Sequence, residues 1–229
     1  IDFLLKSLPN TPEQLRAILE RIISVDTGNE FITFEIKSVL PISVAKKYAG
    51  ISASLVAHIK NTRTPFSIDF GVGDVIVPKQ EKRKIPTQLN DFSSPMINTY
   101  SLETTIAEKI DAILSLMEFS SRMKDYYDIY YLANKFDFDG KILVDALKRT
   151  FANREHNFTV EQFEQVMSFD ADDLMQRKWK AFIKKIDAKT DDFSKVINTI
   201  DDFLRFPIET ALNGTNFLMQ WKASSNIWE

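Results

Sequence analysis

Short segments in the first third of the chain alternate between apolar and polar residues, and this period of two predicts β-strands. The clearest segment runs from Phe66 to Phe70, where the Phe and Ile side chains share one face and Ser67 and Asp69 share the other. Further strands are expected at residues 1–5, 31–36 and 51–59. The pattern therefore predicts half-buried strands with one apolar face and one polar face.

After Met96 the period of the apolar residues changes to about 3.6, which predicts a succession of helices. One earlier helix is expected over residues 12–24, where Thr11 can cap the helix and Pro12 can be its first residue. The later helices are expected over residues 101–117, 121–134, 141–152, 160–167, 170–186 and 193–211, with a last strand or ordered arm over 217–228.

A short extended segment over 75–77 and a polar, Lys-rich connection over 78–95 lie between the strands and the helices. A connection of this length usually serves as a mobile or functional loop, so we expect it to be flexible or lid-like. The change of pattern predicts an α+β fold. Its strand-rich domain is expected over residues 1–98 and its helical domain over residues 99–229.

Two of the predicted strands carry acids. Asp2 is the second residue of the first strand, and Asp69 lies near the end of another, shortly before Gly71, Gly73 and Asp74. Aspartate is disfavoured in strands because its side chain neither branches nor packs on a pleated surface. We therefore expect these acids to have a role beyond folding, the alternative being edge-strand residues that face water.

Two consecutive predicted helices each place a charge on their apolar side. Lys109 points into the middle of an apolar stripe, whereas Glu108 and Asp111 are expected to point away from it. Asp125 lies at the edge of the buried face of the next helix. An unpaired buried charge costs several kcal/mol, so we expect Lys109 and Asp125 to form a salt bridge, to line a wet cleft, or both.

The composition limits the kinds of active site and partner that the chain can have. The 229 residues are 44% hydrophobic with a net charge of −3, so the chain can bury a core and has no overall basic field for nucleic acid. The absence of Cys excludes thiol nucleophiles and thiolate metal sites, and His58 and His156 lie far apart in sequence. A metal would therefore be a hard ion on carboxylates. No apolar run reaches the roughly 18 residues of a membrane helix, so we expect a cytoplasmic protein with no membrane partner.

Acids on neighbouring strands of one sheet suit phosphoryl transfer with two metal ions, because each Mg²⁺ takes oxygen ligands. A lysine on an adjoining helix could neutralise the charge of a triphosphate. No Walker-type phosphate loop or glycine-rich dinucleotide motif is present. An RNA partner would need a local basic segment, and the densest one consists of Lys79, Lys82, Arg83 and Lys84. The alternative is a solvated loop whose charges aid only solubility.

Several segments together resemble the AbiEii nucleotidyltransferase toxins of bacterial abortive-infection and type IV toxin–antitoxin systems, which are phage-defence systems. They are Asp2 with Ile1 and Phe3, residues 48–74, residues 103–109 with Ala107-Glu108-Lys109, and residues 122–128. The order of these motifs matches over about residues 1–135. The resemblance implies a polymerase-β-like nucleotidyltransferase core with a mixed sheet, followed by a helical C-terminal domain.

The resemblance also implies function. It implies Mg²⁺ or Mn²⁺, a nucleoside triphosphate substrate, transfer onto an acceptor that in some relatives is tRNA, and an antitoxin encoded alongside that need not touch the toxin. Asp2 and Asp69 would hold metal, and Lys109 would contact phosphate together with Gly71 and Gly73 in the nucleotide site. Asp125 or Asp128 would orient Lys109 or the nucleotide, and Asp74 is a weaker candidate.

One departure leaves alternatives open. The first motif of the family is Gly-Ser, a spacer and Asp-x-Asp, and only its final Asp, Asp2, is present. The chain starts at Ile1 inside a predicted strand, so we expect further residues upstream of it. The hypotheses are an active nucleotidyltransferase toxin and an inactive relative that binds only nucleotide or a protein partner. A third, a helical interaction module, is disfavoured by the acids on the strands.

Overall fold

The computed structural model describes residues 2–5, 11–28, 31–42, 50–120 and 122–229. It divides into two compact units, Ile1–Asp74 and Val75–Glu229. Two residues at which predicted elements begin, Ile1 and Ser121, lie outside the described part. The boundary falls after Asp74 and not after residue 98 as the sequence pattern predicted. The difference arises because Val77 is buried in the helical core and residues 81–84 pair with residues 96–99.

The unit Ile1–Asp74 contains a mixed four-stranded sheet with the order β1-β4-β3-β2. Its strands are β1 (Asp2–Leu5), β2 (Ile32–Pro41), β3 (Ile51–Ile59) and β4 (Thr62–Val72). The β1 and β4 strands are parallel, and the other neighbouring pairs are antiparallel. All four strands were predicted, but β2 and β4 are longer than expected because antiparallel pairing with β3 extends along them.

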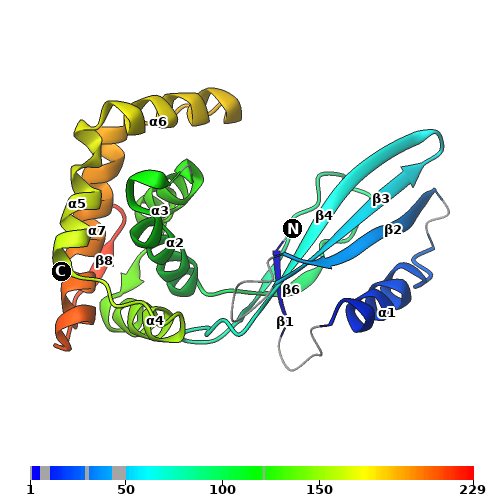
Figure 1. Cartoon of the computed structure of the whole chain (residues 1–229), viewed down its shortest axis with the longest axis horizontal. Helices are drawn as coiled ribbons and strands as arrows, with labels where there is room; N and C mark the ends of the chain where they lie inside the picture. The colour runs from blue at the N-terminus through cyan, green and yellow to red at the C-terminus, as the bar shows by residue number, and fades with distance from the viewer. Residues whose placement is uncertain (1, 6–10, 29–30, 43–49, 121) are drawn as a thin grey trace. The chain divides into compact units, whose positions relative to one another are not determined.

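One face of this sheet is covered by α1 (Pro12–Ile23), which lies beside β2 in Figure 1. The helix begins as the sequence predicted, because the Thr11 hydroxyl accepts a hydrogen bond from the backbone N–H of Gln14. Leu15 and Leu19 of α1 are buried in one apolar cluster with residues from the strands. The buried strand residues of this cluster are Val39, Ile51, Ala53, Leu55 and Phe70.

The unit Val75–Glu229 is mainly helical. Its helices are α2 (Leu102–Leu116), α3 (Met123–Lys135), α4 (Gly140–Asn153), α5 (Val160–Met167), α6 (Asp173–Ile186) and α7 (Phe193–Asn213). Two short 3₁₀ segments cover Met117–Phe119 and Ser168–Ala171. One core cluster draws buried residues from all six helices, each of which the sequence predicted.

Short strands complete this unit. The predicted C-terminal strand or arm consists of β8 (Gln220–Lys222) and β9 (Ile227–Trp228), which form a small antiparallel sheet with β7 (Phe138–Asp139). A separate ribbon pairs β5 (Glu81–Lys84) with β6 (Met96–Thr99). No helix of the described residues is long and apolar enough to cross a membrane.

Candidate active site

The first group of candidate residues lies on the polar face of the sheet. Asp2 and Asp69 are register partners on the parallel strands β1 and β4, and register partners point to the same side of a sheet. Ser52 is the register partner of Asp69 on β3, and its hydroxyl donates a 2.5 Å hydrogen bond to Asp69 Oδ1. Asp2 is exposed and Asp69 is half-buried. The two carboxylates therefore lie on neighbouring strands, on the face opposite α1.

The turn after β4 brings a third acid toward this face. A Cβ atom added at Gly71 would lie 3.7 Å from Oδ2 of Asp74, so the Asp74 side chain folds back over Gly71. The backbone can turn here because Gly73 has a φ of 86°, in the region that side chains disfavour. Gly71 follows Asp69 by two residues and lies on the same face. β4 and the turn after it thus place Asp69, Asp74 and the backbone at Gly71 on the same side of the sheet.

These residues fit a hard divalent ion. Mg²⁺ in proteins is usually held by one or two carboxylates together with substrate phosphates and water. Asp2 and Asp69 supply two such carboxylates, and the Ser52 hydrogen bond fixes the orientation of one of them. Across the described ranges, no group of three or more His, Asp or Glu side chains could hold a metal ion. The substrate would therefore have to complete the ligand set.

The second group joins α2 to α3. The ammonium of Lys109 lies 3.2 Å from Asp125 Oδ1 and 2.5 Å from Asp128 Oδ2. Each acid also has a second cation nearby in sequence: Arg122, the residue before α3, pairs with Asp125, and Lys124 of α3 lies 2.6 Å from Asp128. The side chains of Lys109 and Asp125 are only 16% and 4% exposed. The salt bridge predicted between them is confirmed, within a network of five charges.

Asp111 is buried, although the sequence pattern placed it away from the apolar stripe of α2. Its side chain is 1% exposed and lies 2.8 Å from Arg154 Nη1 and 2.9 Å from His156 Nδ1. Glu108, on the same helix, also pairs with Arg154. Burial raises the pKa of Asp111, and the hydrogen bond with His156 opposes that rise. Its partners Arg154 and His156 come after α4 in the sequence, so the residue pattern of α2 alone could not predict these contacts.

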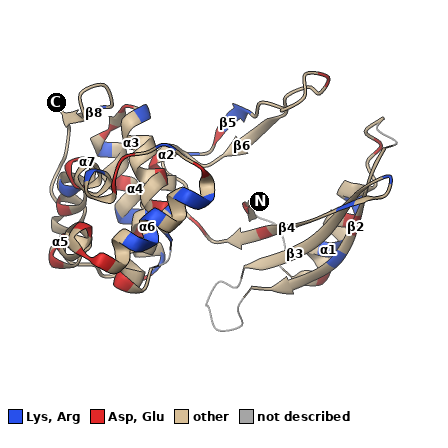
Figure 2. Cartoon of the chain, turned by 90° about the horizontal axis from the view of Figure 1, so that it is seen from above, with Lys and Arg blue, Asp and Glu red and all other residues tan. Residues whose placement is uncertain are grey.

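The basic segment contains a strand that the sequence pattern did not predict. Lys82, Arg83 and Lys84 belong to β5, which pairs with β6, and the blue of Lys and Arg marks β5 in Figure 2. The expectation of a loop over 78–95 is therefore wrong at residues 81–84, which form a strand, whereas the expectation that the connection is flexible or lid-like stays a prediction. Within β5, Arg83 forms an ion pair with Glu81 at 2.7 Å. Lys79 comes before the first residue of β5 and is exposed.

Comparison with known proteins decides the family. The family model described as nucleotidyl transferase AbiEii toxin, type IV toxin–antitoxin system, matches residues 1–205. The chain belongs to the AbiEii family. The resemblance predicted from the motifs is thereby confirmed and extends beyond residue 135. No curated protein matches the chain.

This AbiEii chain is similar to a protein from H. pylori whose crystal structure is described as that of a putative nucleotidyltransferase. The two chains are 13% identical and superpose with a TM-score of 0.42. The similarity covers 93% of this chain and 77% of the other.

The structure brings the candidate residues together in two groups, one in each unit. Asp2 lies beside Asp69, and Lys109 contacts both Asp125 and Asp128. Sequence reasoning missed the contact of Ser52 with Asp69 and the pairing of Arg122 and Lys124 with the acids of α3. The signal for Ser52 was its place on the polar side of an alternating strand. Its hydrogen bond to Asp69 depends on a register that the sequence alone does not determine.

Proposed function

We propose that this chain is a toxin that transfers a nucleotide from a nucleoside triphosphate to an acceptor such as tRNA or another RNA. Family membership supports nucleotidyl transfer, and the polymerase-β-like core implied by the motifs belongs to the same proposal. We infer that the protein acts in the cytoplasm and that its cognate antitoxin is encoded alongside. The alternative is an AbiEii protein that binds nucleotide without transferring it.

The observation that carries this proposal is the register of Asp2 with Asp69 on the polar face of the sheet. A divalent ion held there, Mg²⁺ or Mn²⁺, would neutralise triphosphate charge and orient the attacking and departing oxygens. The acceptor oxygen would bond to the α-phosphorus while the bond to pyrophosphate breaks. In this scheme Ser52 keeps one Asp69 oxygen in a fixed direction through its hydrogen bond. The glycines at 71 and 73 would let a nucleotide approach the backbone.

Lys109 is proposed as the contact to the phosphates. An ammonium has three donor hydrogens, and two of them can be directed at Asp125 and Asp128. The third can be offered to a phosphate oxygen. The two acids would then act as positioning residues that hold the long lysine side chain in one orientation.

The proposal is tested with full-length protein, total RNA, Mg²⁺ and each labelled nucleoside triphosphate in turn. Asp69→Asn keeps the side-chain shape but removes the charge that holds the ion, so transfer should fall at least about 100-fold, which corresponds to about 2.7 kcal/mol. Asp2→Asn should behave alike. Asp91→Asn, an exposed loop residue, is the matched control and should retain activity.

Full activity in Asp69→Asn would overturn the assignment of this acid. Nucleotide binding by the unmodified protein, without transfer to any RNA, would instead favour the inactive relative.

A further inference from the structure

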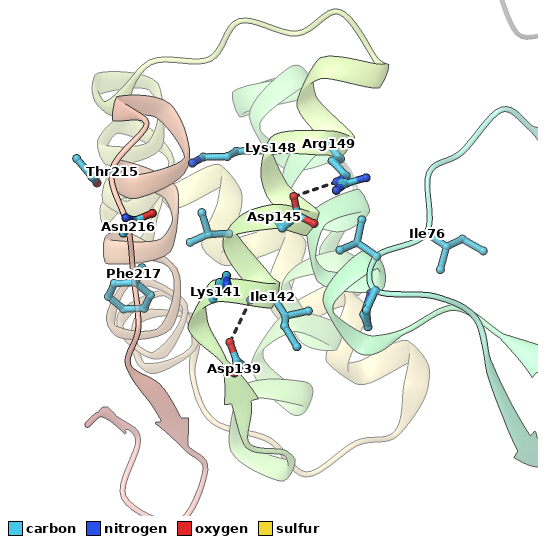
Figure 3. A pocket seen from close by; sticks show the side chains of 13 residues that line it. Ile76, Asp139, Lys141, Ile142, Asp145, Lys148, Arg149, Thr215, Asn216 and Phe217 are labelled. Atoms are coloured by element: carbon cyan, nitrogen blue, oxygen red, sulfur yellow. Dashed lines mark hydrogen bonds and ion pairs between the residues drawn. The ribbon is translucent and has the colours of Figure 1, made fainter.

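A groove of about 730 Å³ in the unit Val75–Glu229 takes no part in the function proposed above. Helix α4 forms its floor, and the segments 76–78 and 215–217 form its sides, as Figure 3 shows. Small-molecule sites usually have volumes of about 300–1,000 Å³, so the groove is large enough to hold a ligand.

The first side of the groove is held by the start of α2. Val77 is buried, and its backbone N–H donates a 2.8 Å hydrogen bond to Thr104 Oγ1. Its carbonyl accepts hydrogen bonds from the hydroxyls of Ser101 and Thr104. Ser101 and Thr104 are themselves fully buried. This side is therefore part of the core and is formed before any ligand arrives.

The opposite side is formed around the ring of Phe217. This ring packs edge-on against Trp228 at 4.8 Å and stacks on Phe206 at 6.4 Å. Gly140, at the start of α4, fits closely beneath it, because an added Cβ would lie 2.4 Å from Phe217 Cδ1. Both sides are thus preformed, which lowers the entropic cost of binding.

The charge left over in the groove is positive. Arg149 pairs with Asp145 at 2.9 Å, and the two oxygens of Asp139 accept hydrogen bonds from Ile142 N–H and Gln220 Nε2. The side chains of Lys141 and Lys148, in contrast, have no ion pair or hydrogen bond with any residue that the structure describes. The two acids of the groove are therefore already engaged, and the two lysines are available to an anion.

The lysines and the apolar walls point to one ligand class. Lys141 and Lys148 are seven residues apart, so they project from the same side of α4 about 10.5 Å apart along its axis. Lysine binds phosphate as a point charge, and aromatic side chains offer bases a surface for stacking. Figure 3 shows Phe217 across from Lys141, on the far side of the groove from Ile76. A bare phosphate would leave the apolar walls unused, and an apolar ligand would leave the lysines unpaired.

We propose that the α4 groove binds a nucleotide, with phosphate at Lys141 and Lys148 and the base against the wall at Phe217. The nucleotide can be free in solution or can be the unpaired end of an RNA strand. This inference does not depend on transfer chemistry, and it can hold even if the chain transfers nothing.

Binding is measured with the full chain carrying Asp69→Asn, in the absence of divalent metal, so that the proposed metal site does not contribute. The probes are AMP, a single-stranded RNA of adenylates and inorganic phosphate. Lys141→Glu with Lys148→Glu should weaken binding of the preferred nucleotide probe at least about tenfold. Lys184→Glu with Lys185→Glu, which reverses two exposed lysines at the end of α6, changes the net charge equally and should alter affinity by less than about twofold.

The base contact is tested by Phe217→Leu, which keeps an apolar side chain and removes the aromatic face, and should weaken nucleotide binding about fivefold or more. AMP bound as tightly as the RNA identifies a free nucleotide as the ligand, whereas much tighter RNA binding identifies a strand end. Circular dichroism checks that each variant is folded, and Lys141→Gln with Lys148→Gln replaces the reversed pair if that pair unfolds. Three results would overturn the proposal: no binding of AMP or RNA, phosphate bound as tightly as AMP, or unchanged affinity in the lysine variants.

Discussion

Replacing Lys109 by Met removes one charge from the network between α2 and α3 and keeps most of the apolar stem. If Lys109 were the sole partner of the buried Asp125, its loss would cost about 3–5 kcal/mol, because an acid would remain buried without a counter-ion. The structure predicts less. Arg122 still pairs with Asp125, and Lys124 still pairs with Asp128. We therefore expect a loss of about 1.5–3 kcal/mol, the usual contribution of a charged hydrogen bond.

The assay is urea unfolding followed by circular dichroism, with Lys124→Met as the control. Lys124 is 72% exposed, so its removal should cost no more than about 1 kcal/mol. Combining Lys109→Met with Arg122→Met deprives Asp125 of both cations. The double variant should therefore lose more stability than the sum of the single losses.

Two results would refute this reasoning. A Lys109→Met variant as stable as Lys124→Met would show that the network does not stabilise the contact between the helices. Strict additivity with Arg122→Met would show that the two cations do not substitute for each other. A Lys109→Met protein that keeps most of its stability but loses nucleotide transfer would support the phosphate role.

Two further predictions concern other charges. Burial and the hydrogen bond to Asp191 raise the pKa of Tyr130 to about 12, so the free energy of unfolding should fall as pH rises from about 10 to 12. The Tyr130→Phe variant should show a smaller fall when urea unfolding is measured at several pH values. Replacing Lys82, Arg83 and Lys84 by Glu should weaken RNA binding and lower its salt dependence, by about 0.7 in the logarithmic slope for each RNA phosphate that these side chains no longer neutralise. Unchanged salt dependence in filter binding would assign these charges to solubility alone.

The sequence predicted the strands and helices well where one local period dominated. Alternation placed Phe70 and Asp69 on opposite faces of β4, and helical spacing placed Asp125 on the buried side of α3. Both assignments need only the geometry of a single element, which a short stretch of sequence contains.

The failures all involve partners distant in sequence. Asp111 is buried because Arg154 and His156 reach it from beyond α4, which its own helix does not reveal. The β5 strand has the sequence Glu-Lys-Arg-Lys, which has little intrinsic β-propensity, and it is a strand because β6 pairs with it. The boundary between the units also depends on a long-range contact, the hydrogen bond that joins Val77 to Thr104.

The parallel register of β1 and β4 ties the position of an acid to the packing of its neighbours. Phe3 lies next to Asp2 and stacks on Phe70 at 5.9 Å, while Leu5 packs against the cluster beneath α1. A slip of one residue would break the stack of Phe3 on Phe70, take Leu5 out of the cluster and turn Asp2 toward the face that α1 covers. A register of β1 that misplaces Asp2 is therefore less stable than the observed one. Substitutions at Phe3 or Leu5 should consequently impair the chemistry at Asp2, although neither side chain takes part in it.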